Sequence, residues 1–183
     1  MQWRNTSTRY GLLSRAIHWG SALAVFGLFG LGLWMRSLDY YSEWYQRGPD
    51  LHKSIGVLLF AVLLLRLVWR FVSPPPAQPA AFSPLVKLAA HAMHGLLYFG
   101  LFAVMVSGYL ISTADDRVLE VFGLFSLPSL LSFEQQEDIA GEIHEYGAWA
   151  LVIFAVLHGL AALKHHFIDR DDTLRRMAGP AKD

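Results

Sequence analysis

The sequence of 183 residues contains no cysteine, and this absence removes several kinds of chemistry at once. Disulfide bonds, iron–sulfur clusters on thiolate ligands and covalent cofactor attachment through cysteine are all excluded. Charge is also scarce, because charged residues make up 16% of the chain whereas hydrophobic residues make up 54%. The eight histidines are therefore prominent among the side chains that remain for binding a metal.

Four stretches carry no Asp, Glu, Lys or Arg, and their lengths indicate membrane spans: Ala16 to Met35, Ser54 to Leu65, Leu88 to Ala114 and Tyr146 to Leu163. About 20 apolar residues cross a bilayer, and the second stretch reaches that length only when it includes Arg66 and Arg70. A soluble four-helix bundle would show a polar stripe, which residues 22–33 (ALAVFGLFGLGL) lack. The sequence predicts an all-α membrane protein, one domain over residues 1–183, with transmembrane helices at about 16–38, 52–72, 88–113 and 144–167.

The formal net charge of zero conceals a strong polarity across the predicted bundle. If the helices alternate in direction, one end carries eleven of the fifteen Lys and Arg residues and the other end carries eleven of the fifteen Asp and Glu residues. By the positive-inside rule, we expect both termini to be cytoplasmic and the chain to be a multi-pass membrane protein. The inner end then carries about +7 and the outer end about −7, with four outer cations: Arg36, Arg47, Lys53 and Arg117.

Two histidines, His144 and His158, stand fourteen residues apart in the last apolar stretch. Fourteen residues of an α-helix fall about 40° short of four turns and advance about 21 Å, so both rings share one face at two depths. His18 opens the first predicted helix at the inner end, and His52 opens the second at the outer end. The four side chains therefore form two level pairs, His18 with His158 and His52 with His144.

Two level pairs of histidines predict two haems stacked across the membrane, each iron held by two imidazoles. The haems would be b-type, because a chain without cysteine has no C-x-x-C-H attachment site. Both axial positions would be filled, so the haems would transfer electrons and would not bind oxygen at iron. For any one of these histidines, a hydrogen-bonded residue at the membrane interface is the alternative; the set of four favours ligation.

Several glycines stand where a haem would need clearance. Gly32 follows His18 by fourteen residues and so reaches the outer level on the same helix face, and Gly56 follows His52 by one turn. Gly108 reaches the outer level in a similar way from the third helix. We predict that they contact the cofactor, with ordinary small-residue packing between membrane helices as the alternative.

Arg66 lies fourteen residues after His52, and hence on the same helix face at the inner level. A charge at that depth is costly without a partner, and a haem propionate supplies one; extension of the side chain to a lipid phosphate is the alternative. His91 and His94 open the third helix at the inner end. His94 is the better candidate of the two for the inner iron, a propionate or a quinone, and an interfacial position is its alternative.

The connection between the third and fourth helices holds an apolar segment, residues 118–133 (VLEVFGLFSLPSLLSF). Ser132 and Gln135 have capping-box spacing and predict a short separate helix after this segment. The segment could lie on the membrane and cover the outer haem, it could be a docking surface, or it could simply pack at the membrane interface, which is the commonest fate of apolar loops beside a bilayer.

Five sequence motifs resemble the bacterial cytochrome b561 family across nearly the whole chain. They are I-H-W at 17–19, L-H-K-S-I-G at 51–56, the proline run after Arg70, G-Y-L-I-S-T-A at 108–114, and L-H-G-L-A-A-L-K-H-H-F at 157–167 followed by D-D-T-L-R-R-M at 171–177. The resemblance implies four helices, two b haems and electron exchange with membrane quinone, with ubiquinone as the expected acceptor or donor. It assigns the ligand role to His18, His52, His144 and His158.

Two branches of the family imply different functions. One branch is a superoxide oxidase that passes an electron from superoxide to ubiquinone, and the other is often paired with a periplasmic isoprenoid-binding protein. This chain looks more similar to the second, and an outer face of about −7 would not attract an anionic radical unless the four outer cations form a local basic pocket. The expectation is a quinone-linked oxidoreductase, or an electron-relay subunit that serves a periplasmic partner. No nucleic-acid partner is expected.

Overall fold

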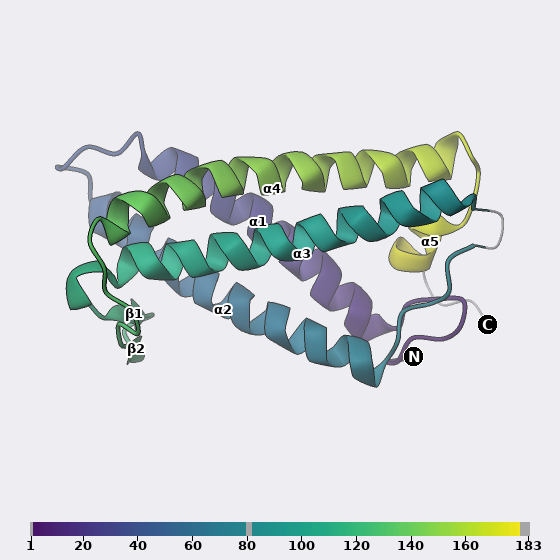
Figure 1. The fold of residues 1–183 in the computed structure, drawn as a ribbon, viewed down its shortest axis with the longest axis horizontal. Helices are drawn as coiled ribbons and strands as arrows, with labels where there is room; N and C mark the ends of the chain where they lie inside the picture. Colours follow the sequence, from purple (N-terminus) through teal and green to yellow (C-terminus); the bar gives the residue numbers. More distant parts are fainter. Residues whose placement is uncertain (1, 80–81, 180–183) are drawn as a thin grey trace.

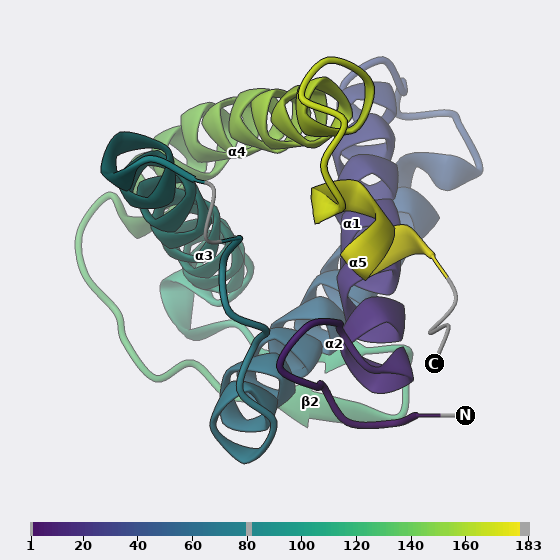
Figure 2. The same cartoon turned by 90° about the vertical axis from the view of Figure 1, so that its right-hand side faces the viewer.

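The computed structural model describes residues 2–79 and 82–179, in which four long helices form a ring-shaped bundle (Figures 1 and 2). All four are long and apolar enough to cross a membrane, which confirms the predicted class. The N-terminal tail and the short helix α5 lie at one end, which we call the inner end; the opposite end is the outer end. The helices are α1 Leu12–Met35, α2 Trp44–Val72, α3 Pro84–Ser112, α4 Gln136–Phe167 and α5 Thr173–Ala178.

The long helices pack mainly as two antiparallel pairs, α1 with α2 and α3 with α4. Only 6–11% of the residues in the most apolar part of each helix are buried within the protein. Such low burial is expected where one helix face meets lipid and the opposite face lines an open interior. The buried apolar side chains of the described residues include Leu28, Leu59 and Leu151, which line a cavity inside the bundle.

The predicted helix starts were too late by four to eight residues. The helices begin at residues 12, 44, 84 and 136, where we predicted 16, 52, 88 and 144. Uncharged stretches mark where a chain enters the membrane, whereas a helix continues into water for as long as its backbone hydrogen bonds are made. Arg47 and Asp50 lie in such an extension of α2, which also accommodates Pro49 within its second turn.

The predicted short helix with a capping box at Ser132 is wrong. Helix α4 begins directly at Gln136, without a side-chain cap, after Gln135 in the left-handed conformation (φ 58°). The outer connection instead contains a short 3-10 turn, η1 (Ala114–Asp116), and a β-hairpin that the sequence did not predict. In the hairpin, β1 (Leu119–Val121) pairs antiparallel with β2 (Phe125–Leu127).

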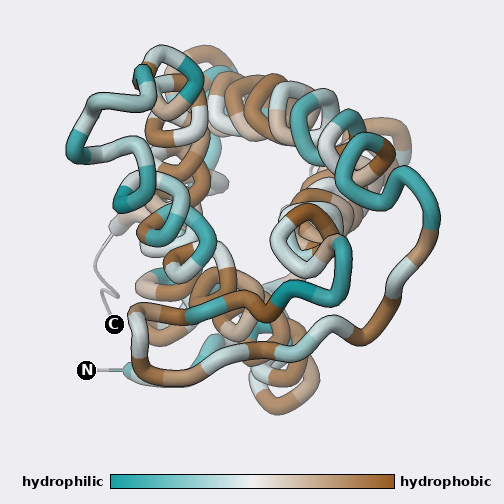
Figure 3. Tube along the Cα trace, turned by 90° about the vertical axis from the view of Figure 1, so that its left-hand side faces the viewer, coloured by the Kyte–Doolittle hydropathy of each residue, from teal (hydrophilic) through white to brown (hydrophobic). Residues whose placement is uncertain are grey.

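The hairpin crosses the outer end of the bundle, with hydrophobic positions along both strands (Figure 3). The side chains of Leu119 and Val121 are almost fully buried, at 3% and 1% exposure, and β1 contacts α2. The backbone N–H of Phe122 donates a hydrogen bond of 2.9 Å to Ser54 Oγ, which is itself buried on α2. The hairpin is therefore fixed to the start of the second span.

Three segments from distant parts of the sequence close the inner end. Asn5 in the N-terminal tail hydrogen-bonds Ser73 in the connection after α2, through its backbone N–H and its side-chain amide. Arg176 in α5 donates to the carbonyl of Ala77 and accepts, through its own carbonyl, the backbone N–H of Tyr10. The connection after α2 and both terminal segments are thereby held together.

Candidate functional site

The structure brings the four predicted histidines together as two pairs at two levels. The ring centroids of His18 in α1 and His158 in α4 lie 6.3 Å apart, with 78° between the ring planes. Those of His52 in α2 and His144 in α4 lie 6.0 Å apart, with 68° between the planes. Each pair joins helices that are distant in sequence, so four positions chosen by spacing meet at the two expected depths.

Two further predicted residues join the inner pair. The ring centroid of His94 lies 5.0 Å from that of His158, and the Nδ1 of His94 hydrogen-bonds the carbonyl of Ala90 at 2.6 Å. The Nη2 of Arg66 lies 3.3 Å from the Nδ1 of His18, and its guanidinium lies over the ring of Tyr98 at 5.5 Å. Arg66 forms no ion pair with any carboxylate in the described part of the chain. The inner level therefore carries a cation that no carboxylate of the described residues neutralises.

At the outer level, the two paired histidines differ in their hydrogen bonds. The Nδ1 of His144 donates to the carbonyl oxygen of Val104 in α3 at 2.9 Å, which leaves Nε2 free. Ser107, which is 3% exposed, donates its hydroxyl to the same carbonyl at 3.0 Å and lies 3.4 Å from His144 Nδ1. The Nδ1 of His52 is buried, and no described residue hydrogen-bonds it.

An apolar cavity of about 600 Å³ surrounds His52 and His144. Its size lies within the range of about 300–1,000 Å³ that is typical of ligand and cofactor sites. Gly32, Gly56 and Gly108 all line it.

The three glycines differ in how closely they approach a histidine. A Cβ on Gly108 would lie 3.0 Å from His144 Cε1, and one on Gly32 would lie 3.5 Å from His52 Cε1. A Cβ on Gly56 would meet nothing within 4 Å of protein. A side chain at position 108 would therefore be crowded by His144, and one at position 32 would make an ordinary contact with His52. A side chain at position 56 would point into open cavity space.

Acidic residues neutralise most of the cations at the outer end. Arg36 is paired with Glu145, Lys53 with Asp50 at 2.9 Å, and Arg117 with Glu137 at 2.5 Å. Arg36, Lys53 and Arg117 therefore do not form the local basic pocket that would attract an anion to this acidic end.

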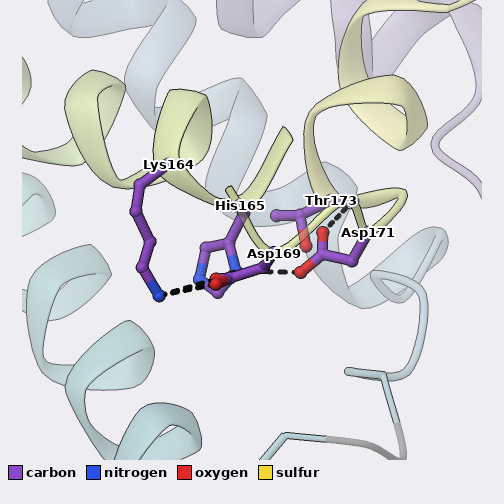
Figure 4. A network of polar contacts seen from close by, with 5 residues as sticks. All are labelled: Lys164, His165, Asp169, Asp171 and Thr173. Atoms are coloured by element: carbon purple, nitrogen blue, oxygen red, sulfur yellow. Dashed lines mark hydrogen bonds and ion pairs between the residues drawn. The ribbon is translucent and has the colours of Figure 1, made fainter. Parts of the chain in front are cut away.

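A separate polar network links the end of α4 to α5 (Figure 4). His165 Nδ1 lies 3.0 Å from Asp169 and 2.8 Å from Asp171, and Lys164 also binds Asp169. Asp171 accepts the first backbone N–H of α5, from Thr173, at 2.8 Å. Burial would raise the pKa of Asp171, but the hydrogen bonds from Thr173 and His165 outweigh it and hold the pKa below its usual value. This network fixes the C-terminal helix, and we assign it no ligand.

Sequence reasoning missed the contact of Val104 and Ser107 with His144. Periodicity places Gly108 at the outer level but does not say which helix faces it. The small pair Ser107–Gly108 was the available signal, because two adjacent small residues on a membrane helix allow a neighbouring helix to approach closely.

Four apolar helices with paired histidines at two levels define an all-α multi-pass membrane protein. Over residues 9–180 the sequence matches the family of prokaryotic cytochrome b561, and the chain belongs to that family. It is 53% identical to cytochrome b561 homolog 2 of Escherichia coli (strain K12) over 98% of this chain and 96% of that protein. It is 27% identical to the probable superoxide oxidase CybB of Yersinia pestis, over 92% and 95% of the two chains.

Family membership establishes the coarse function. The protein is a bacterial multi-pass membrane cytochrome that takes part in electron transfer, and the family implies b-type haem. The resemblance recognised from the motifs is therefore confirmed.

Proposed function

We propose that this protein transfers electrons across the bacterial cytoplasmic membrane through two b haems and exchanges them with membrane quinone. The inner haem would be held by His18 and His158, and the outer haem by His52 and His144. Both termini would face the cytoplasm, in agreement with the distribution of Lys and Arg.

The separation of the paired rings carries this proposal. An imidazole nitrogen lies about 2.0–2.1 Å from a bound metal and about 1.1 Å from its own ring centre, so two imidazoles on opposite sides of one metal have centroids roughly 6.3 Å apart. The observed values are 6.3 Å for His18 with His158 and 6.0 Å for His52 with His144. His94 and His158, at 5.0 Å, are too close to share one metal in this way. We therefore assign His94 a place beside the inner haem and not on its iron.

The surroundings of the outer pair also fit a haem. The bond from His144 Nδ1 to Val104 fixes the ring so that Nε2 faces the cavity, which is how proteins commonly orient a histidine that binds metal. The open cavity space at Gly56 leaves room for a macrocycle edge against backbone. When bound, the haems would supply reversible one-electron chemistry.

Arg66 is suited to hold a propionate of the inner haem. Its guanidinium lies within the second span, next to His18, and lacks a carboxylate partner among the described residues. A cation within a membrane span is unfavourable without a counter-ion, and a carboxylate of the cofactor would supply one through charge-assisted hydrogen bonds.

The neutralised cations of the outer end favour a donor other than superoxide. A site that draws an anionic radical from solution needs a positive mouth, whereas Arg36, Lys53 and Arg117 are each paired with an acid. The protein is then an electron relay that serves a periplasmic partner, for which the family resemblance suggests an isoprenoid-binding protein. Superoxide:ubiquinone oxidoreductase activity is the second candidate, because a probable superoxide oxidase aligns with 92% of the chain.

Haem content of purified variants tests the proposal. The pyridine-haemochrome assay should give two haems per chain with a low-spin spectrum, and His158→Ala should lose the inner haem. His94→Ala should keep two low-spin haems, and exposed His91→Ala is the control outside the cluster. One haem per chain in the unmodified protein, or loss of a haem in His94→Ala but not in His158→Ala, would contradict the ligand assignment.

Rapid mixing separates the two functional candidates. Purified protein is mixed with superoxide in the presence and absence of ubiquinone, and haem reduction is followed optically. The relay function predicts reduction no faster than the uncatalysed decay of superoxide. Fast reduction that continues to quinone would establish the oxidase instead.

A further inference from the structure

The turn of the outer hairpin presents apolar side chains that the rest of the protein does not cover. Leu124 is 82% exposed and Phe122 is 47% exposed, and Leu130 in the chain leaving the hairpin is 79% exposed. Residues 121–133 contain no charged side chain, although the outer end as a whole is strongly acidic. An uncharged apolar turn on an acidic face indicates a partner that is itself apolar.

The backbone of this turn is held in an uncommon conformation. Phe122 and Gly123 both have positive φ, 50° and 66°, and the N–H of Leu124 bonds the carbonyl of Val121 at 2.9 Å. Glycine and asparagine are the usual residues in such a turn, and a bulky aromatic residue there persists only where its surroundings hold it. Here the hydroxyl of Ser54 accepts a hydrogen bond from the N–H of Phe122 and so holds this residue in the turn. The structure therefore keeps an aromatic ring at the tip at some conformational cost.

We propose that the tip of the hairpin, Phe122–Leu124, inserts into the outer leaflet of the membrane. Ser54 begins the uncharged stretch of α2, so the tip lies where that helix enters the bilayer. Leu58, one turn further along the membrane-spanning helix α2, is 51% exposed and is therefore available to lipid. The tip therefore continues a lipid-facing surface that already exists.

The two faces of the hairpin agree with an interfacial position. Glu120 pairs with Ser126 on the exposed face of β1, whereas its neighbours Leu119 and Val121 face the protein. A hairpin with a polar face and an apolar tip suits the boundary between head groups and acyl chains. A basic protein would be drawn to the acidic residues of this end and not to an uncharged turn.

Backbone groups of the turn and of the loop after it are hydrogen-bonded, so these segments can lie among lipid head groups and acyl chains. The turn closes its own hydrogen bond, and Tyr109 bridges the following loop by donating to the Pro128 carbonyl and accepting the Leu130 N–H. Polar backbone groups at the membrane need such partners. Because Leu119, Leu127 and Leu130 also line the cavity around His52, a hairpin anchored in lipid would shield that cavity from water.

Spin labelling tests this inference directly, since a chain without cysteine accepts a single label at any chosen site. Leu124→Cys is labelled with a nitroxide, and Glu120→Cys on the polar face of the same hairpin is the matched control. The holoprotein in lipid nanodiscs is exposed to oxygen, which concentrates in lipid, and to a water-soluble nickel chelate. We expect collisions with oxygen to exceed those with nickel at position 124 and the reverse at position 120.

Nickel accessibility at position 124 equal to that at position 120 would overturn the inference. A label at 124 shielded from both reagents would also overturn it, because it would indicate contact with protein, either a second copy or another partner. Phe122→Cys provides the same test at a second site of the tip if Leu124→Cys does not fold. Insertion of the hairpin tip does not depend on which histidines hold the haems. Measuring haem content in the same labelled samples therefore shows whether the ligand assignment or the insertion is wrong.

Discussion

Substitution of Gly108 by alanine gives the most selective test of the cavity around the outer histidines. The new Cβ would lie 3.0 Å from His144 Cε1 and 3.2 Å from His144 Nδ1, whereas apolar contacts are normally about 3.5–4.0 Å. The ring would have to move by roughly half an ångström. The ring cannot move freely, because the Nδ1 of His144 is hydrogen-bonded at 2.9 Å to the carbonyl of Val104. Val104 lies one turn before Gly108 on α3, so the same helix holds the ring and would clash with it.

Overpacking of this kind costs about 1–3 kcal/mol, which corresponds to roughly a 5- to 150-fold loss of affinity for a haem bound through His144. Gly95→Ala on the same helix is the matched control, because a Cβ there would meet nothing within 4 Å. Both exchanges gain about 1 kcal/mol of helix propensity, so general helix stability is matched between them.

Haem content and redox titration of the two variants measure the effect. Gly108→Ala should lose or shift the outer haem and retain the inner haem unchanged, and Gly95→Ala should retain both. Equal loss of the two haems in Gly108→Ala would show that the residue supports helix packing in general. Full retention of an unshifted outer haem would refute the clearance argument.

Three further predictions concern charge and hydrogen bonding. Arg66→Gln should lower the midpoint potential of the inner haem alone, by roughly 70 mV for a unit charge about 10 Å away in an effective dielectric of about 20; redox titration of both haems checks this. Ser107→Ala frees the Val104 carbonyl for His144 and should make that imidazole more electron-rich, so the midpoint of the outer haem should fall while haem content stays constant. The lowered pKa of Asp171 means that its contribution to docking of α5 is complete above the usual carboxyl pKa and is lost as the pH falls through the lowered value. Proteolysis of the C-terminal segment should therefore accelerate at acid pH, and Asp171→Asn should make it fast at every pH.

The arrangement of the spans and the histidine levels followed from the sequence because two physical constraints determine them. A bilayer fixes the length of an apolar helix, and a repeat of 3.6 residues per turn places His144 and His158 on one face at two depths. Their partners then follow from the alternation of helix direction. The helix starts were missed because α2 and α4 continue past the membrane boundary into polar sequence, including Arg47 and Glu137.

The hairpin and the contacts of His144 depend on interactions that periodicity does not encode. Gly123 is the single residue of the turn that signals a left-handed conformation; Phe122 disfavours it, and the stabilising hydroxyl comes from Ser54, 68 residues away. Ser107 likewise meets His144 across 37 residues. Such contacts arise only once the helices are packed.

The distribution of charge bears on the direction of electron transfer. Arg66 at the inner level lacks a carboxylate partner among the described residues, whereas Arg36 at the outer level is neutralised by Glu145. A cation at this position would stabilise the reduced, less positive state of a nearby haem, by about 1.7 kcal/mol for a unit charge at about 10 Å in an effective dielectric of about 20. A membrane potential of about 100 mV, negative inside, opposes inward movement of an electron over about 21 Å of a 30 Å core by about 1.6 kcal/mol. If two haems are bound as proposed, the two terms are of similar size, so the cation at the inner level would offset the membrane potential for an electron that passes from the outer haem to the inner one.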